Sequence, residues 1–266
     1  MKKNVYLTVL TIVTVLCIIT GCLMHLNSFN WNIPVLHLKE HRLEFVSGED
    51  LDAGPMTANS QSLDAFSEIQ IDTNVLEATI QVGDSYGVSL DCNEKLIPTV
   101  SVENGTLLVK QRTQNRWFQG STKAEMTITV PAGTDLKALT ATHNVGDLNV
   151  EGINIDVVDV KVNVGDVNLD DITGKTLTVD SDTGDVEAEA CSFEKVTIKS
   201  DIGDADYEST KDLSDYKMDL KTDVGEINLK NSDQDSDHYG VDHSYKQNGS
   251  AGELNITVDV GSITVK

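Results

Sequence analysis

Val145-Gly146-Asp147-Leu148-Asn149-Val150 returns five more times along this chain, each time with small changes. Its glycine recurs at a strict spacing of 19 residues and then after 22 and 36 residues, which gives the column Gly146, Gly165, Gly184, Gly203, Gly225 and Gly261. An acidic residue follows most of these glycines, as at Asp147, Asp166, Asp185 and Asp204. A fixed period of this size is typical of stacked repeats.

Apolar and polar residues alternate on both sides of the repeated glycine. Leu177-Thr178-Val179 precedes Gly184, and Val186-Glu187-Ala188 follows it. Alternation with a period of two predicts half-buried strands, with aliphatic side chains inward and polar side chains outward. We therefore predict an all-β, single-stranded β-solenoid, right- or left-handed and similar to a β-helix, with coils of about 19 residues. A long meander folded into a sandwich is the alternative, but a meander has no reason to repeat at a constant period.

Further alternating runs extend the β pattern toward the N-terminus as far as Phe66. Gly83-Asp84 and Pro131-Ala132-Gly133 predict turns that end two of these runs. Asn104-Gly105 predicts a tight hairpin, because both residue types tolerate positive φ angles. The polar insert 231–252 lies inside the final 36-residue spacing, and we expect it to be a loop at one edge of the spiral.

An uncharged run from Val5 to Met24 follows Lys2 and Lys3 and has the length of a membrane-spanning helix. Positive charge before the run and acidic protein after it predict a location at the extracytoplasmic face of the cell membrane. Ile19-Thr20-Gly21-Cys22 also resembles a lipobox, in which case the chain would be cleaved before Cys22 and lipidated on it. The two kinds of anchor stay open.

Three regions follow from these patterns. We expect residues 1–25 to be the membrane anchor or lipoprotein signal, residues 26–62 to be a linker and residues 63–266 to be the β-repeat domain. Leu36, Leu38, Leu43 and Phe45 predict either a short strand or an amphipathic stretch within the linker.

The charge balance limits the classes of partner. Against 20 basic residues stand 43 acidic ones, for a net charge of −23. Phosphate backbones are bound by Lys and Arg, so nucleic acid is excluded as a partner. Cations or cationic molecules are possible ligands of such a surface, but we favour plain solubility as the explanation of the charge.

The column of Gly-Asp pairs, extended by Asp84 and Glu226, permits two interpretations. It could be a ladder of carboxylates bridged by calcium, or a series of Asx-type turns in which each carboxylate accepts backbone N–H bonds. We favour turns, because one carboxylate per coil is too few for a calcium site. Residues 233–237 begin like an EF-hand loop, but His238 and Ser244 stand where that loop needs Gly and Glu. We predict no metal site and no cofactor.

No catalytic motif is present, and we predict that the protein is not an enzyme. His143 lies beside a repeat turn, and we expect it to be exposed at a strand end. Cys92 and Cys191 could form a disulfide or be two separate buried residues. Two polar segments are candidate partner-binding loops: Arg112, Arg116, Trp117 and Phe118 in one, and Asp233, Asp235, Asp237, His238 and Tyr239 in the other.

The repeat region resembles the bacterial putative-adhesin family with β-strand repeats, a domain of unknown function also found in Lia-type envelope-stress proteins. The resemblance rests on Phe66–Ile71, Ile80–Asp84, Val102–Leu107, the Gly-Asp turns and Gly252–Gly261. It implies a cell-surface location and no established chemistry. We predict a module for binding or scaffolding, in adhesion or in sensing envelope stress, whose partner is an unidentified envelope or surface protein or glycan. A passive structural spacer or surface-layer protein is the alternative, and a glycan-active enzyme is a remote third.

Overall fold

The computed structural model describes residues 35–39, 42–46, 53–111, 122–229 and 243–266. Two compact units result, and the smaller one lies within residues 1–52. Its described part is an antiparallel hairpin of β1 (Val35–Lys39) and β2 (Arg42–Val46), so the strand alternative for this stretch is correct. The expected anchor run and Cys22 lie outside the described residues. Among the residues described, the structure contains no helix long and apolar enough to cross a membrane.

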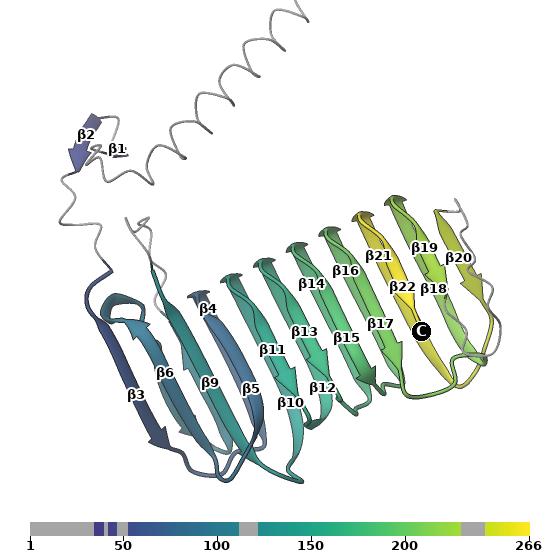
Figure 1. The fold of residues 1–266 in the computed structure, drawn as a ribbon, viewed down its shortest axis with the longest axis horizontal. Coiled ribbons are helices and arrows are strands. Elements are labelled where there is room, and N and C mark those ends of the chain that lie inside the picture. Colours follow the sequence, from purple (N-terminus) through teal and green to yellow (C-terminus); the bar gives the residue numbers. More distant parts are fainter. Residues whose placement is uncertain (1–34, 40–41, 47–52, 112–121, 230–242) are drawn as a thin grey trace, which may run out of the picture. The chain divides into compact units, whose positions relative to one another are not determined.

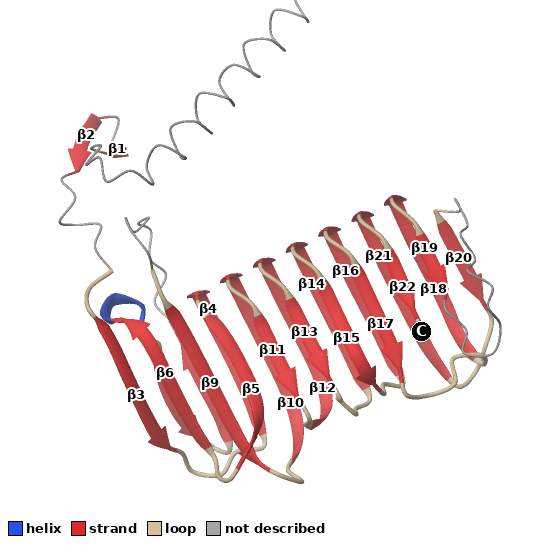
Figure 2. Cartoon of the chain, in the orientation of Figure 1, coloured by secondary structure: helices blue, strands red, loops and turns tan. Residues whose placement is uncertain are grey.

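The larger unit confirms the all-β prediction. It consists of two ten-stranded mixed sheets, and the longest helical element in its described residues is one 3-10 turn at Glu94–Leu96 (Figures 1 and 2). The front sheet in Figure 1 runs in the order β19 (Ile227–Leu229), β22 (Ile263–Val265), β17 (Ala205–Ser209), β15 (Val186–Cys191), β13 (Val167–Asp170), β11 (Leu148–Glu151), β5 (Glu77–Gly83), β9 (Ala124–Pro131), β6 (Gly87–Asn93) and β3 (Met56–Ser62). The back sheet runs in the order β20 (Ser244–Gln247), β18 (Tyr216–Val224), β21 (Gly252–Val260), β16 (Lys195–Ile202), β14 (Thr176–Thr183), β12 (Asn154–Val164), β10 (Asp135–Val145), β4 (Glu68–Val75), β8 (Thr106–Lys110) and β7 (Thr99–Glu103).

The repeats pair in parallel. Leu139 lies opposite Val158, and Val158 lies opposite Leu177, so these partners are 19 residues apart. The front sheet has the same offset, with Leu148 opposite Val167 and Val167 opposite Val186. Each repeat therefore contributes one strand to the back sheet and, after its glycine, one strand to the front sheet.

The core lies between the two sheets and is built from the inward aliphatic side chains. Val167, Leu169, Val186 and Ala188 are buried and Glu187 is exposed, as the alternation predicts. His143 is a correction, because it is completely buried rather than exposed at a strand end. Its Nδ1 lies 2.8 Å from the hydroxyl oxygen of Thr73, so the ring is held inside the sheet sandwich.

The last repeat does not follow the order of the chain. Strand β21 pairs in parallel with β16 on one side and with β18 on the other, although β18 precedes it in sequence. In the same way, β22 lies between β17 and β19. Along the sequence, the chain passes over one position in the stack, runs through the outer coil of β18 and β19, and returns through β21 and β22 to the position between them and β16 and β17. This route explains why the regular spacing gives way to 22 and 36 residues.

Three further expectations can be compared with the structure at the ends of the sandwich. Asn104 and Gly105 have φ angles of 52° and 80°, so the predicted hairpin joins β7 and β8. The predicted linker 26–62 is too long, because β3 (Met56–Ser62) pairs antiparallel with β6 and belongs to the front sheet. The insert 231–252 is also more than a loop, since β20 (Ser244–Gln247) pairs antiparallel with β18.

The cysteines are separate. Cys92 and Cys191 are both free and buried, so the disulfide alternative is wrong. Cys191 lies in the core, and its Sγ is 3.7 Å from the Leu169 carbonyl oxygen. Burial raises the pKa of the Cys191 thiol to about 11. Both residues act as small apolar side chains.

Candidate binding edge at the glycine turns

The repeated glycines form one edge of the sandwich, which we call the turn edge. The six glycines of the column have φ angles between 133° and 154°. A Cβ atom at Gly165 would overlap the carbonyl oxygen of Gly146, and one at Gly184 would overlap that of Gly165. Any side chain here would therefore push neighbouring repeats apart. This contact between backbones is the physical reason that glycine recurs.

The acidic residues after the glycines form an aspartate ladder. Asp147 Oδ1 accepts a hydrogen bond from the backbone N–H of Asp166 at 2.9 Å, and Asp166 Oδ1 accepts one from Asp185 at 2.8 Å. Asp185 and Asp204 continue the series with the N–H groups of Asp204 and Ser262. The carboxylates thus accept backbone N–H bonds as predicted, but the donor belongs to the next repeat in space, whereas an Asx-type turn is local.

Asp84 is not part of this ladder, contrary to the sequence prediction. Gly83 lies at the end of β5 opposite Pro131, far along the strand from the turn edge. In the neighbouring coil, formed by β4 and β5, the position next to Gly146 is occupied by Leu76, whose N–H donates to the Val145 carbonyl. No glycine is needed there, because the side chain of Gln111 caps this turn. Its Oε1 accepts the N–H of Val75 at 2.7 Å, and its Nε2 donates to the Val75 carbonyl at 2.8 Å.

Aliphatic side chains are exposed immediately before the glycines. We call this set the aliphatic ridge, and each member is between 45% and 61% exposed: Val145, Val164, Ile202, Val260 and Val224. Ile202 lies opposite Val260, which lies opposite Val224, and Thr183 fills the one place without an aliphatic group. Parallel strands are about 4.8 Å apart, so the ridge extends across six repeats over about 24 Å and is interrupted at Thr183. Exposed aliphatic groups in a row are the kind of surface that can take part in interactions.

A second polar row borders the ridge on the back-sheet side. At one end it consists of asparagines, with Asn163 Nδ2 donating to Asn144 Oδ1 at 3.0 Å and Asn144 Nδ2 donating to Asn74 Oδ1 at 2.8 Å. At the other end the corresponding positions are the exposed carboxylates Asp182, Asp201, Asp259 and Asp223. Asp223 is paired with Lys221 at 2.7 Å, and this bond lowers its pKa. The ridge therefore runs between two rows rich in carboxylates.

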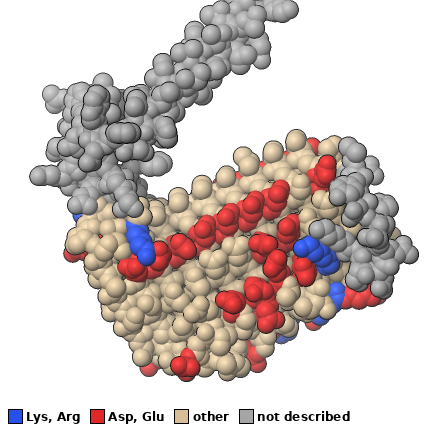
Figure 3. Space-filling view, in the orientation of Figure 1, with Lys and Arg blue, Asp and Glu red and all other residues tan. Residues whose placement is uncertain are grey.

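The two sheets carry different charges. None of the ten front-sheet strands contains Lys or Arg, and together they contain nine acidic residues. The back-sheet strands contain 13 acidic residues, but these are accompanied by eight lysines. Figure 3 shows acidic side chains in a row across the front sheet, close to the turn edge. Burial and the neighbouring carboxylate of Glu189 raise the pKa of Glu187, as expected where negative charge is not compensated.

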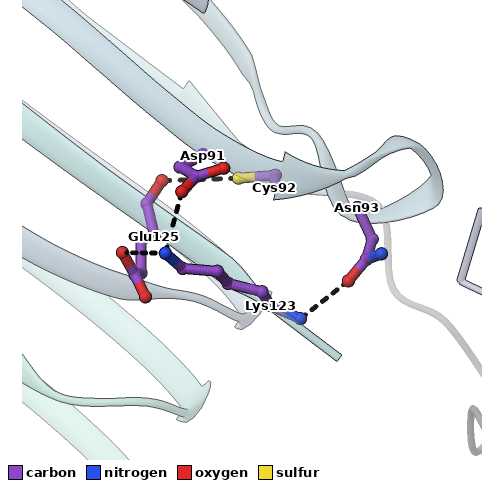
Figure 4. Close-up of polar contacts among 5 residues, drawn as sticks. All are labelled: Asp91, Cys92, Asn93, Lys123 and Glu125. Carbon is purple, nitrogen blue, oxygen red and sulfur yellow. Dashed lines mark hydrogen bonds and ion pairs between the residues drawn. The ribbon is translucent and has the colours of Figure 1, made fainter. Parts of the chain in front are cut away.

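One lysine neutralises the N-terminal end of this face. Lys123 Nζ lies 2.8 Å from carboxylate oxygens of both Asp91 and Glu125, and these bonds raise the pKa of the lysine (Figure 4). The backbone N–H of Lys123 also donates to Asn93 Oδ1 at 2.7 Å, which fixes the start of β9. Over the repeats Lys266 pairs with Glu208 at 3.2 Å, and the carboxylates of the aspartate ladder have no lysine within ion-pair distance in the described residues.

The partner-binding loops predicted from sequence cannot be compared with this edge. Residues 112–121 and 230–242 lie outside the described residues, and so do Arg112, Arg116, Trp117, Phe118, Asp233, Asp235, Asp237, His238 and Tyr239. Within the described ranges, three or more metal-ligating side chains do not gather anywhere.

The aliphatic ridge is the feature that sequence reasoning missed, although a Val or Ile before five of the six repeated glycines was a visible signal.

Comparisons with known proteins agree with this architecture. The structure is similar to that of a putative cell adhesion protein from Clostridium sporogenes, with a TM-score of 0.50 and 15% identity, covering 80% of this chain and 99% of that one. It is also similar to a putative adhesin from Bacteroides fragilis, with a TM-score of 0.43 and 16% identity, covering 80% and 97% of the two chains. At these identities the likeness concerns the fold alone.

A search of curated proteins found no match. The sequence itself matches the family described as Toastrack DUF4097 over residues 66–266, which is most of the chain. The alternating strands, the Gly-Asp turns and the closing repeat that suggested the resemblance all lie inside this match. The chain belongs to the Toastrack DUF4097 family.

Proposed function

We propose that this protein is a non-catalytic binding module of the bacterial cell surface. In this proposal an N-terminal anchor holds a solenoid of about 19-residue coils at the extracytoplasmic face of the membrane, and the turn edge contacts the partner. The observation that carries the proposal is the aliphatic ridge with carboxylates along both of its sides. The putative adhesins among the structural neighbours are in keeping with a surface role.

The chemistry of the edge favours a particular class of partner. Burying an exposed aliphatic stripe contributes about 25 cal/mol per Å² of apolar area. The flanking carboxylates attract cationic groups and accelerate association with them. A protein surface or segment that joins aliphatic and cationic side chains satisfies both requirements. An anionic glycan would be repelled, and sugar recognition usually uses exposed aromatic rings. Among the aromatic residues that the structure describes, Phe66, Phe193, Tyr207 and Tyr216 are buried, and Tyr86 and Tyr245 are half-buried.

The alternative is a passive spacer, whose role would not depend on an exposed aliphatic ridge. The experiment that distinguishes the two is retention of envelope proteins by the detergent-solubilised full chain. We expect the triple change Val164→Ser, Ile202→Ser and Val260→Ser to reduce specific retention at least tenfold. The side chains are about half exposed, so the fold should persist.

Val157→Ser is the matched control. Val157 is 41% exposed, comparable to the ridge residues, but it lies in the middle of β12 on the back sheet. This variant should retain the same proteins as the wild type. Retention should also weaken with added salt if the carboxylate rows take part. Equal retention by the ridge variant and the wild type would leave the spacer as the better explanation.

A further inference from the structure

The four strands at the ends of the two sheets are protected to different degrees. An unpaired strand edge is a template for another strand, and proteins usually block it with charge or by making it short. The back sheet ends in β7, which contains Glu103, and in β20, which contains Lys246. One end of the front sheet is β19, only three residues long. The other end is β3, which is seven residues long and contains no charged residue.

Strand β3 also projects beyond the sandwich. The order of the strands puts β5, β9 and β6 of the front sheet level with β4, β8 and β7 of the back sheet, so β3 has no counterpart. All seven of its residues are exposed. Both faces and one edge of this strand are therefore free in the part of the unit that the structure describes.

The direction of the backbone groups shows which ones face the open edge. Leu63 N donates to the Tyr86 carbonyl at 3.0 Å, which sets the alternation along the antiparallel pair of β3 and β6. By this alternation the backbone groups that bond to β6 are those of Gln61, Asn59 and Thr57. The N–H and C=O groups that point away from the sheet are then those of Ser62, Ser60 and Ala58.

Charge decides which partner suits this edge. Two copies of a chain with a net charge of −23 repel each other over most of their surfaces. At β3 this repulsion is reduced, because the strand carries no charge and Lys123 is paired with the nearby carboxylates of Asp91 and Glu125. We propose that β3 pairs with β3 of a second copy, antiparallel about a two-fold axis, so that the two front sheets become one continuous sheet.

The register follows from the length of the strand. Full overlap of Met56–Ser62 with its copy places Asn59 opposite itself and Ala58 opposite Ser60. In this register the groups that face the open edge form about eight backbone hydrogen bonds. Asn59 then forms a pair without backbone hydrogen bonds, in which the Cα atoms are about 4.5 Å apart, within the range of a disulfide.

Cysteine cross-linking of the full chain tests the register. Asn59→Cys should form a disulfide-linked dimer under mild oxidation. Ser62→Cys is the control in the same exposed strand, since the register separates the two Ser62 positions by about 20 Å. The wild-type chain gives the background from its own cysteines. Equal cross-linking of the two variants, or none from Asn59→Cys, would overturn the proposed pairing.

Sedimentation of the full chain in detergent tests the hydrogen bonds. Ser60→Pro removes an N–H group from the open edge without removing a bond to β6, and proline is tolerated in edge strands. It should raise the dissociation constant of the dimer at least tenfold. Ser60→Ala keeps the amide and should dimerise like the wild type. A chain that is monomeric at every concentration, or a dimer unaffected by Ser60→Pro, would show that β3 is not the interface.

Discussion

Replacing a repeat glycine by alanine separates backbone strain from the contact between neighbouring repeats. Gly165 has a φ angle of 143°, and a Cβ there would overlap the carbonyl oxygen of Gly146. The conformation alone costs about 1–3 kcal/mol for a residue with a side chain. The overlap is with backbone, which cannot rotate away, and overpacking of this kind adds about 1–3 kcal/mol. We expect Gly165→Ala to lower the free energy of unfolding by about 4 kcal/mol.

Gly133→Ala is the matched control. Gly133 also has a positive φ angle, 76°, but a Cβ there would meet nothing within 4 Å. Only the conformational part remains, so this variant should lose about 1 kcal/mol. Urea titration followed by far-UV circular dichroism measures both losses, provided that the slope with denaturant is unchanged. If the two variants lose the same stability, the close approach of the backbones is not what requires glycine at the turn edge.

Four more predictions concern the ladder, the core and the anchor. Asp166→Asn should lower the free energy of unfolding by less than about 0.5 kcal/mol and Asp166→Ala by about 1 kcal/mol, because an amide oxygen can still accept the Asp185 N–H. Equal losses in urea titrations would mean that the charge itself matters. Millimolar calcium should leave the melting temperature of the chelator-treated protein unchanged, whereas a rise of more than about 10 °C would reveal tight binding to the folded state. Burial lowers the pKa of His143 to about 4, below its value in the unfolded chain. The contribution of His143 to the free energy of unfolding should therefore be complete above about pH 6.5 and should fall by about 3 kcal/mol as the pH falls toward 4. His143→Leu should lose this dependence, and an unchanged pH profile in that variant would contradict the assignment. The wild-type chain should remain with membranes, and Cys22→Ala should abolish lipid labelling only if the anchor is a lipoprotein; release of the wild type as a soluble species would contradict both kinds of anchor.

The repeat period and the alternation predicted much of the architecture. The constant spacing indicated parallel stacking, and the small residue at each turn indicated close backbone contact, because both are local properties of a repeated unit. The insertion of β21 between β16 and β18 could not be predicted in the same way. Neighbouring coils present similar aliphatic strands, such as Val196-Thr197-Ile198 and Leu254-Asn255-Ile256, so the pattern does not specify which strand pairs with which. The order is decided by the length of the connections between the coils.

The expectation that His143 is exposed was wrong, and the exposed valines of the turn edge were missed, for one physical reason. Strict alternation from Leu139 and Ala141 places His143 and then Val145 inward, and the hydropathy of the two residues suggests that valine is the better core residue. In the structure His143 is completely buried and Val145 is 45% exposed, because the chain turns through Gly146 directly after the valine. The turn carries the last side chain of the strand out of the core.

The same arrangement, in which a buried polar residue lies two positions before an exposed aliphatic residue, recurs in other repeats and bears on the proposed function. Ser200 is buried without a hydrogen-bond partner for its Oγ, and Ile202 is exposed two residues later. Thr222 and Val224 have the same order, but the Thr222 hydroxyl donates to the Gly261 carbonyl at 2.9 Å. Exposed aliphatic side chains add little to stability, and buried hydroxyl groups are unfavourable unless they are bonded. Exchanging the two residue types would therefore improve the core and the solubility together. Ser200 and Ile202 keep the less stable arrangement, and a partner that uses the exposed ridge, as we propose, would account for it.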